Sequence, residues 1–323
     1  MKDRSWCLAR SVLAGLVLLA LVAAPPLQAQ QKRLVTIASG WVVGVYYPLA
    51  GAISRIVHTK LPGVRATVES SGASVANAKL IASGDADFAL LQNDIAFYAV
   101  NGTLMFANQP VKNMGGVFTL YPELIQVVAT RSSGIKSIRD LKGKRVAIGP
   151  LGSGTEANTV QILEAYGMTL DALGKVERIG PAEASDQLKD GRIDAGFYTT
   201  GLGAAVILDT FISEKVAMVP VAGREAEALK KKYPFYTVTR IPAGTYRGQD
   251  ADVTTVAVMA MMVARSDLSE DLVYDLTKAV FENLETFHSA HAAAKNLTLK
   301  SAREGMPIPL HPGAQRFYRE KGA

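Results

Sequence analysis

Short apolar runs alternate along this chain with longer stretches in which apolar residues recur every three or four positions. The short runs predict β-strands, and the periodic stretches predict helices. This alternation indicates an α/β fold with mixed sheets flanked by helices. The expected strands are 33–38, 64–69, 87–91, 124–130, 145–148, 175–179, 194–198, 216–220 and 253–264, and the expected helices are 47–60, 73–83, 93–100, 153–166, 181–190, 203–212, 223–232 and 269–287.

A strand that runs into a glycine-containing loop and then into a helix occurs twice. Ser39–Gly44 follows the apolar run Leu34–Ile37, and Gly149–Thr155 follows Arg145–Ile148. The free amides and the positive dipole end of a helix N-terminus suit an anionic or polar ligand. Two such loops in two similar halves predict a ligand held in a cleft between them.

Chain length and two extended passages predict how the halves are divided. A chain of 323 residues exceeds one ordinary core. One passage lies at 121–130 and a return passage lies within 233–246, and such paired crossovers act as a hinge. The Pro-rich stretch 306–313 is expected to form a loop along the outer surface. The expected division is lobe I at 30–125 plus 245–323 and lobe II at 126–244.

The first 29 residues have the pattern of a secretory signal peptide. Lys2, Arg4 and Arg10 precede an apolar core of 14 residues, 11–24, and the small residue Ala29 offers a cleavage point. A retained membrane anchor is the alternative, but a membrane-spanning helix needs roughly 20 apolar residues. We therefore expect an exported, periplasmic protein that is cleaved near Ala29.

Charge and residue usage exclude several classes of function. The net charge of +6 is spread along the chain without a dense basic run among aromatic residues, so no nucleic acid partner is expected. Cys7 is the only cysteine and lies in the leader, which leaves the mature chain without a thiol. His288 and His291 lack an evident third ligand. Because no Gly-x-Ser-x-Gly motif occurs either, we expect no metal, no cofactor and no enzyme activity.

Candidate ligand-binding residues lie in the two loops and at the carboxyl ends of strands, where open α/β sheets bind ligands. Hydroxyl groups at helix starts either contact the ligand or cap the helix, and both interpretations are open. Aromatic side chains are expected to form walls of the cleft. The candidates are Ser39, Gly40, Trp41, Tyr46, Tyr47, Ser70, Ser74, Gln92, Asn93, Tyr121, Ser153, Gly154, Thr155, Tyr198 and Thr199.

Two charged residues near the first crossover have two interpretations each. Glu123 either holds an amine group of the ligand or is a solvated surface carboxylate. Arg131 is either a carboxylate clamp or half of a surface ion pair, and it is left out of the candidate set.

Motifs along nearly all of the mature chain resemble the TAXI family of solute-binding receptors, which serve TRAP-type membrane transporters. The resemblance implies a two-lobed periplasmic-binding-protein fold and delivery of an acidic solute or amino acid, such as glutamate or 2-oxoglutarate, to TRAP integral membrane subunits. The motifs are Tyr46–Leu49, Glu69–Asn77, Ser83–Asp87, Asp140–Val146, Gly152–Asn158, Lys232–Tyr236, Ile241–Tyr246 and Pro307–Ala314.

The first loop departs from the family pattern. Trp41, Val42 and Val43 replace small or hydroxyl-bearing residues, which removes hydrogen-bond donors and adds bulk. This departure keeps open an ABC-type binding protein for an aromatic or sulfonate-like ligand. An exported enzyme on the same scaffold, or a ligand-loaded partner of a membrane sensor, are further alternatives.

Overall fold

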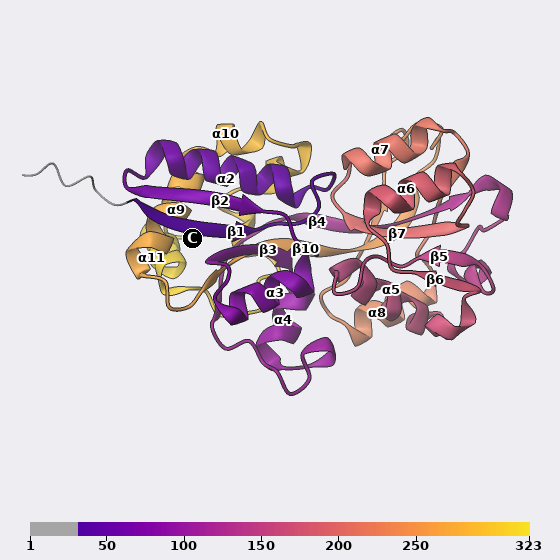
Figure 1. The fold of residues 1–323 in the computed structure, drawn as a ribbon, viewed down its shortest axis with the longest axis horizontal. Coiled ribbons are helices and arrows are strands. Elements are labelled where there is room, and N and C mark those ends of the chain that lie inside the picture. Colours follow the sequence, from indigo (N-terminus) through magenta and orange to yellow (C-terminus); the bar gives the residue numbers. More distant parts are fainter. Residues whose placement is uncertain (1–31) are drawn as a thin grey trace, which may run out of the picture. The chain divides into compact units, whose positions relative to one another are not determined.

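The computed structural model describes residues 32–323, so the expected signal peptide and Cys7 lie outside the described residues. Strands and helices alternate along most of this part of the chain (Figure 1). The strands are β1 (Arg33–Ala38), β2 (Val64–Glu69), β3 (Phe88–Gln92), β4 (Met114–Thr130), β5 (Arg145–Ala147), β6 (Lys175–Glu177), β7 (Ala195–Thr200), β8 (Val216–Val219), β9 (Thr237–Ile241) and β10 (Val253–Arg265). The α-helices are α2 (Tyr46–Lys60), α3 (Ser74–Ser83), α4 (Asn93–Asn101), α5 (Gly154–Ala165), α6 (Pro181–Lys189), α7 (Ala205–Ile212), α8 (Arg224–Lys232), α9 (Glu270–Phe281), α10 (Leu284–His288) and α11 (Pro312–Lys321).

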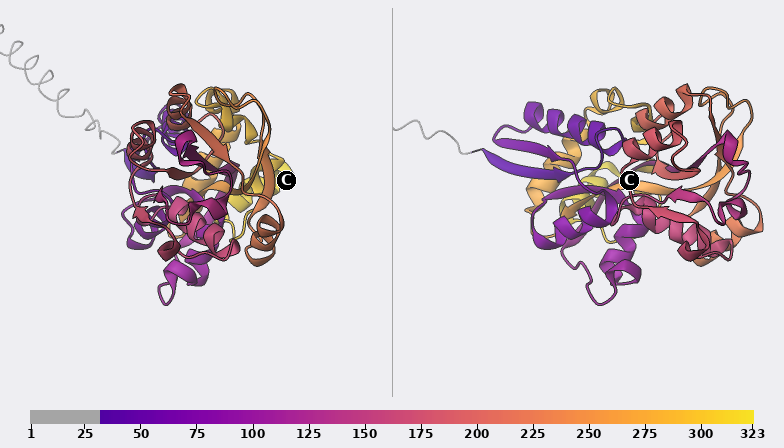
Figure 2. Two further views of the ribbon diagram at one scale, coloured as in Figure 1. Left: turned by 90° about the vertical axis from the view of Figure 1, so that its right-hand side faces the viewer. Right: turned by 45° about the vertical axis from the view of Figure 1, so that its right-hand side comes forward.

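The strands form one mixed sheet of ten strands. Eight of them follow the order β2-β1-β3-β10-β4-β7-β5-β6, while β8 pairs with β4 and β9 pairs with β10. The pairs β1–β3, β5–β6 and β5–β7 are parallel, whereas all pairs made by β4 and β10 are antiparallel. Helices flank both faces of this sheet (Figures 1 and 2). The predicted α/β fold class is therefore confirmed.

Two long strands, β4 and β10, lie in the middle of the sheet. They connect one group of strands, β2, β1 and β3, with a second group, β7, β5 and β6. The part of β10 at 260–264 pairs with β3, and its first residues, 253–257, pair with β9. β4 pairs with β10 and, over its second half, with β7 and β8. All residues of β4 except Pro122 are buried. Such burial explains why these strands are continuous apolar runs without alternation.

Helix packing follows the apolar periodicity of the sequence. In α2, Leu49, Ile53 and Ile56 are buried at a spacing of three to four residues, and they pack in the same core cluster as α9 and α11. A second cluster contains residues of α5 and α8 with β5 and β7. A third contains residues of α3 and α4. No helix within residues 32–323 is long and apolar enough to cross a membrane.

The structure corrects the sequence prediction at three places. β4 begins at Met114, ten residues before the expected strand. The strand continues through Pro122 because the pairing of β4 with β10 is irregular at that point, and proline is tolerated at such irregularities. The strand β9 lies in what was expected to be a connecting passage. The expected helix 269–287 is two helices, α9 and α10.

The C-terminal stretch is packed more tightly than the expected surface loop. Leu310 forms a bridge with Gly116 of β4, and His311 is buried. His311 accepts a hydrogen bond from the amide of Gly313 and caps α11. In α11, Phe317 stacks on Phe281 of α9 with ring centroids 5.2 Å apart. Residues 306–311 lie outside the helices, as expected of a loop, and Pro312 marks the start of α11, where proline is favoured.

The close approach of α11 to α9 predicts that Gly313→Ala destabilises the protein. A Cβ atom at Gly313 would collide with the carbonyl oxygen of Glu270 and would lie 2.7 Å from the amide nitrogen of Tyr274, and neither backbone atom can move freely. We expect a loss of about 1–3 kcal/mol in the free energy of unfolding, measured by urea denaturation. The control is Gly51→Ala in α2, where the nearest atom lies 3.7 Å away and helix propensity favours alanine. Equal stability of Gly313→Ala and wild type would contradict the prediction.

Candidate ligand-binding site

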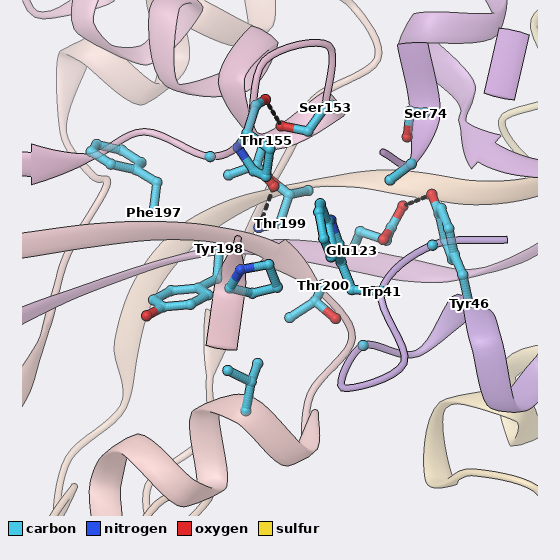
Figure 3. Close-up of a pocket in the computed structure, with 18 of the residues that line it drawn as sticks. Trp41, Tyr46, Ser74, Glu123, Ser153, Thr155, Phe197, Tyr198, Thr199 and Thr200 are labelled. Atoms are coloured by element: carbon cyan, nitrogen blue, oxygen red, sulfur yellow. Dashed lines mark hydrogen bonds between the residues drawn. The ribbon is translucent and has the colours of Figure 1, made fainter. Parts of the chain in front are cut away.

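A cavity lies where the two strand–loop–helix repeats and β4 come together (Figure 3). The loop after β1, the loop after β5 and the carboxyl ends of β3 and β7 line this cavity. Strand ends in open α/β sheets provide such a position. The lining residues are Gly40, Trp41, Gly44, Val45, Tyr46, Ala73, Ser74, Gln92, Tyr121, Glu123, Ala147, Gly149, Pro150, Ser153, Gly154, Thr155, Ile179, Pro181, Ala184, Phe197, Tyr198, Thr199, Thr200 and Val206.

The first loop brings a large aromatic side chain into the cavity. Trp41 reaches across to the start of α6, where its ring would lie 3.6 Å from a Cβ atom on Gly180. Gly40 allows Tyr46 to pack closely, because a Cβ atom there would lie 3.3 Å from the Tyr46 ring. Trp41 and Tyr46 therefore make an aromatic wall on this side of the cavity.

The second loop combines helix capping with cavity lining. Ser153 accepts a hydrogen bond from the amide of Glu156 at 3.1 Å and donates one to the carbonyl of Pro150 at 2.7 Å. Thr155 Oγ1 accepts a bond from the amide of Thr199 at 3.3 Å. The capping interpretation of Ser153 is thus confirmed. Gly154 and Thr155, at the start of α5, line the same cavity, and the first amides of a helix have no intrahelical partner.

Asn158 of α5 connects the cavity wall with a buried polar network behind it. Its Oδ1 accepts hydrogen bonds from Gln92 at 3.1 Å and from Thr199 at 3.0 Å. Its Nδ2 donates to Asp94 at 3.1 Å and to the Tyr236 hydroxyl at 2.7 Å. All four hydrogen-bonding positions of this amide are used, and the bonds join β3, α4, α5, β7 and the segment before β9. Because the Asn158 amide is fully bonded, it favours one relative placement of these elements, although Asp94 and Gln92 each keep one oxygen without a partner.

Glu123 of β4 is a buried acid in the cavity wall. Its residue is 3% exposed, and the Tyr46 hydroxyl donates a 2.5 Å hydrogen bond to its Oε2 (Figure 3). Burial, and to a lesser extent the nearby Asp94, raise the pKa of Glu123 to about 8, against the opposing effect of the Tyr46 and Tyr121 hydroxyls. Of these two hydroxyls, only that of Tyr46 has hydrogen-bond geometry. The interpretation of Glu123 as a solvated surface carboxylate is therefore wrong.

A second buried acid lies just behind the cavity. Asp94 in the first turn of α4 is fully buried, and burial raises its pKa to about 7. Its Oδ2 accepts the bond from Asn158, whereas Oδ1 has no hydrogen-bond partner among residues 32–323. No arginine, lysine or histidine is among the residues that line the cavity. Two carboxyl groups thus lie in or beside the cavity without a protein cation in its wall.

The candidate residues fall into two groups in the structure. Eleven of them line the cavity: Gly40, Trp41, Tyr46, Ser74, Gln92, Tyr121, Ser153, Gly154, Thr155, Tyr198 and Thr199. Ser39, Tyr47, Ser70 and Asn93 do not.

Three of the four other candidates support the site through hydrogen bonds to the backbone. Ser39 donates to the carbonyl of Glu69 at 2.7 Å, and Ser70 donates to the carbonyl of Gly40 at 2.9 Å. Asn93 accepts a bond from the amide of Met259 at 3.0 Å, opposite Pro122. These polar groups hold the first loop and the β4–β10 pair in place, because buried polar groups need partners.

Sequence reasoning missed part of the cavity wall. Phe197 and Thr200 of β7 line the cavity together with the expected Tyr198 and Thr199. The wall also includes Ile179 and Pro181, at the start of α6. The β7 residues were accessible to the strand-end rule, whereas nothing in the local pattern places α6 at the cavity. No group of three or more His, Cys, Asp or Glu side chains that could bind a metal occurs within the described part of the chain.

The fold is that of periplasmic solute-binding proteins, and its cavity lies at the carboxyl ends of the strands. Residues 37–322 match the model of the NMT1-like family, and the chain belongs to that family. The comparison does not show the narrower TAXI resemblance, which stays a prediction.

Solved structures show the same fold at low sequence identity. One is PhnD1 from Prochlorococcus marinus (MIT 9301) in complex with methylphosphonate, with 11% identity, a TM-score of 0.56, and coverage of 81% of this chain and 89% of that chain. A structure from Bordetella bronchiseptica RB50 has 17% identity, a TM-score of 0.54 and coverage of 87% and 84%. A periplasmic transporter structure has 13% identity, a TM-score of 0.54 and coverage of 92% and 93%.

The two buried acids predict that stability falls as the pH rises. The folded state keeps protons on Glu123 and Asp94 at pH values where the unfolded chain releases them, so stability is lost between about pH 4 and pH 8. Glu123 faces Tyr46, Tyr121 and Asp94, none of which supplies positive charge. We expect Glu123→Gln to flatten the decline of the melting temperature from pH 5 to pH 8.

The control for this prediction is Glu285→Gln, a change at an exposed carboxyl group. It is expected to leave the pH dependence of the melting temperature as in wild type. Parallel curves for Glu123→Gln and wild type would contradict the prediction.

Proposed function

We propose that this protein is an exported solute-binding protein that captures a small organic ligand and delivers it to membrane transporter subunits. The observation that carries this proposal is the single cavity built from both strand–loop–helix repeats, with Trp41 of one loop reaching Gly180 beyond the other. The ligand is enclosed by movement of the expected lobes, 30–125 plus 245–323 and 126–244, about β4 and β10. Export to the periplasm rests on the leader sequence.

The start of α5 is the proposed contact for a polar or anionic group of the ligand. Gly154 and Thr155 line the cavity, and the first turn of a helix has amides without intrahelical partners. A carboxylate, as in glutamate or 2-oxoglutarate, would accept hydrogen bonds from these amides and from the Thr155 hydroxyl. The methylphosphonate-bound structure of the same fold supports a small anionic group more generally.

The Thr155 contact predicts weaker ligand binding by Thr155→Val. Native mass spectrometry of the purified protein identifies a co-purified solute, and isothermal titration then measures its affinity. Loss of one hydroxyl contact is expected to cost about 1 kcal/mol, which is roughly fivefold in affinity. The control is Thr59→Val on the exposed face of α2. Equal affinities of Thr155→Val and wild type would exclude this contact.

The transporter class has two candidates. The methylphosphonate ligand of one structure with the same fold is closer to the sulfonate-like ligand of the ABC-type alternative, which the altered first loop left open, than to the carboxylate expected of a TRAP receptor. The TRAP candidate rests on the sequence motifs alone, such as Gly152–Asn158 and Ile241–Tyr246.

Solute uptake into vesicles that carry the cognate membrane subunits separates the two transporter classes. We expect uptake to depend on this protein and on ATP hydrolysis. Uptake that needs this protein but continues without ATP would assign it to a TRAP transporter instead. Uptake that is unaffected by omission of the protein would contradict the proposed function.

A further inference from the structure

The cavity wall is rich in hydrogen-bond acceptors that have no donor. Among the described residues, Glu123 receives a single hydrogen bond, from Tyr46, although a carboxylate offers two oxygens. Gln92 Oε1 is buried, faces the side of α5 where Gly154 lies, and has no partner. The buried hydroxyl of Tyr121 also has none. Buried acceptors of this kind are unfavourable unless a donor reaches them.

The same wall carries five aromatic side chains. Trp41, Tyr46, Tyr121, Phe197 and Tyr198 line the cavity, and Trp41 comes from the loop that departs from the family pattern. The faces of aromatic rings attract cations, most strongly when the cation has lost its water. A cavity wall that combines these aromatic rings with the buried Glu123 therefore favours a positively charged group over a second carboxylate.

Charge balance points in the same direction. A buried ionised carboxylate is costly unless it is paired, and Glu123 is only 3% exposed and has no protein cation in the cavity wall. In the free protein the raised pKa of Glu123 favours the protonated carboxyl group, so a proton neutralises the charge that no protein cation pairs with. A positively charged ligand would stabilise the ionised form of Glu123, whereas an anionic group would make no favourable electrostatic interaction with this carboxyl group.

We propose that the solute carries a positively charged nitrogen, an organic ammonium group, that pairs with Glu123 among the aromatic side chains of the cavity. This inference rests on the proposed binding function and narrows its ligand class. The ammonium group donates to the free oxygen of Glu123 and to Gln92 Oε1. An anionic group at the start of α5 is compatible with this arrangement, and the solute is then zwitterionic.

Matched compounds that differ only in the amine test the inference. The pairs are glutamate and glutarate, taurine and ethanesulfonate, and 2-aminoethylphosphonate and ethylphosphonate. Full-length protein with Trp6→Phe has Trp41 as its single tryptophan, so its fluorescence reports events at the cavity. In at least one pair the amine-bearing member is expected to bind tenfold or more tightly than its partner, as measured by Trp41 fluorescence and isothermal titration.

A Glu123→Gln variant in the same background is expected to bring the affinity ratio of that pair close to one. Glu285→Gln, at an exposed position, is expected to preserve it. The ratio measured on the Trp6→Phe protein decides the matter if Glu123→Gln does not fold. If no pair binds, the presence or absence of a charged nitrogen in the co-purified solute decides.

Equal or tighter binding of the amine-free members would overturn the inference and leave the solute-binding function intact. Failure of every compound to bind, together with the absence of any co-purified solute, would reject the proposed function itself. The two failures are therefore distinguishable.

Discussion

The pairing of β4 with β10 is the constraint on which the rest of the structure depends. β10 pairs with β3 on one side, and β4 pairs with β7 and β8 on the other, so these two strands together join the two groups of the sheet. Near the middle of β4 the register against β10 shifts, and Pro122 lies at that point. Because side chains alternate along a strand, Tyr121 and Glu123 share one face and both enter the cavity. The same strand therefore joins the two groups and places the acid between them.

This placement has a stability cost. Glu123 and Asp94 are buried acids with raised pKa values, and a core of the same shape without them would be more stable. Asn158 limits the cost by bonding Asp94 on one side and the cavity residues Gln92 and Thr199 on the other. Polar groups that weaken the free protein are expected where a ligand completes their hydrogen bonds.

Sequence reasoning identified what local patterns determine and missed what tertiary pairing determines. The repeated loops, the cap at Ser153 and the strand-end position of Gln92 were predictable because each follows from neighbouring residues. Glu123 was ambiguous because its burial depends on Tyr46, 77 positions earlier in the chain. The early start of β4 was hidden by Pro122, which usually argues against a central strand. The burial of the C-terminal stretch depends on contacts with α9 and β4 that no local pattern reveals.

The two repeats both run strand–loop–helix but differ in chemistry, and this difference would orient an asymmetric solute of the proposed kind. The second loop keeps its hydroxyl groups and the free amides at the start of α5, which favour negative charge. The first loop has Trp41 in the cavity wall, and its helix opens with Tyr46 bonded to Glu123. That side of the cavity therefore favours a positive or aromatic group. The two preferences lie at separate places in the wall, so a solute with opposite charges at its two ends has one favourable orientation. In the reversed orientation each charged end of the solute would face the part of the wall that disfavours its charge.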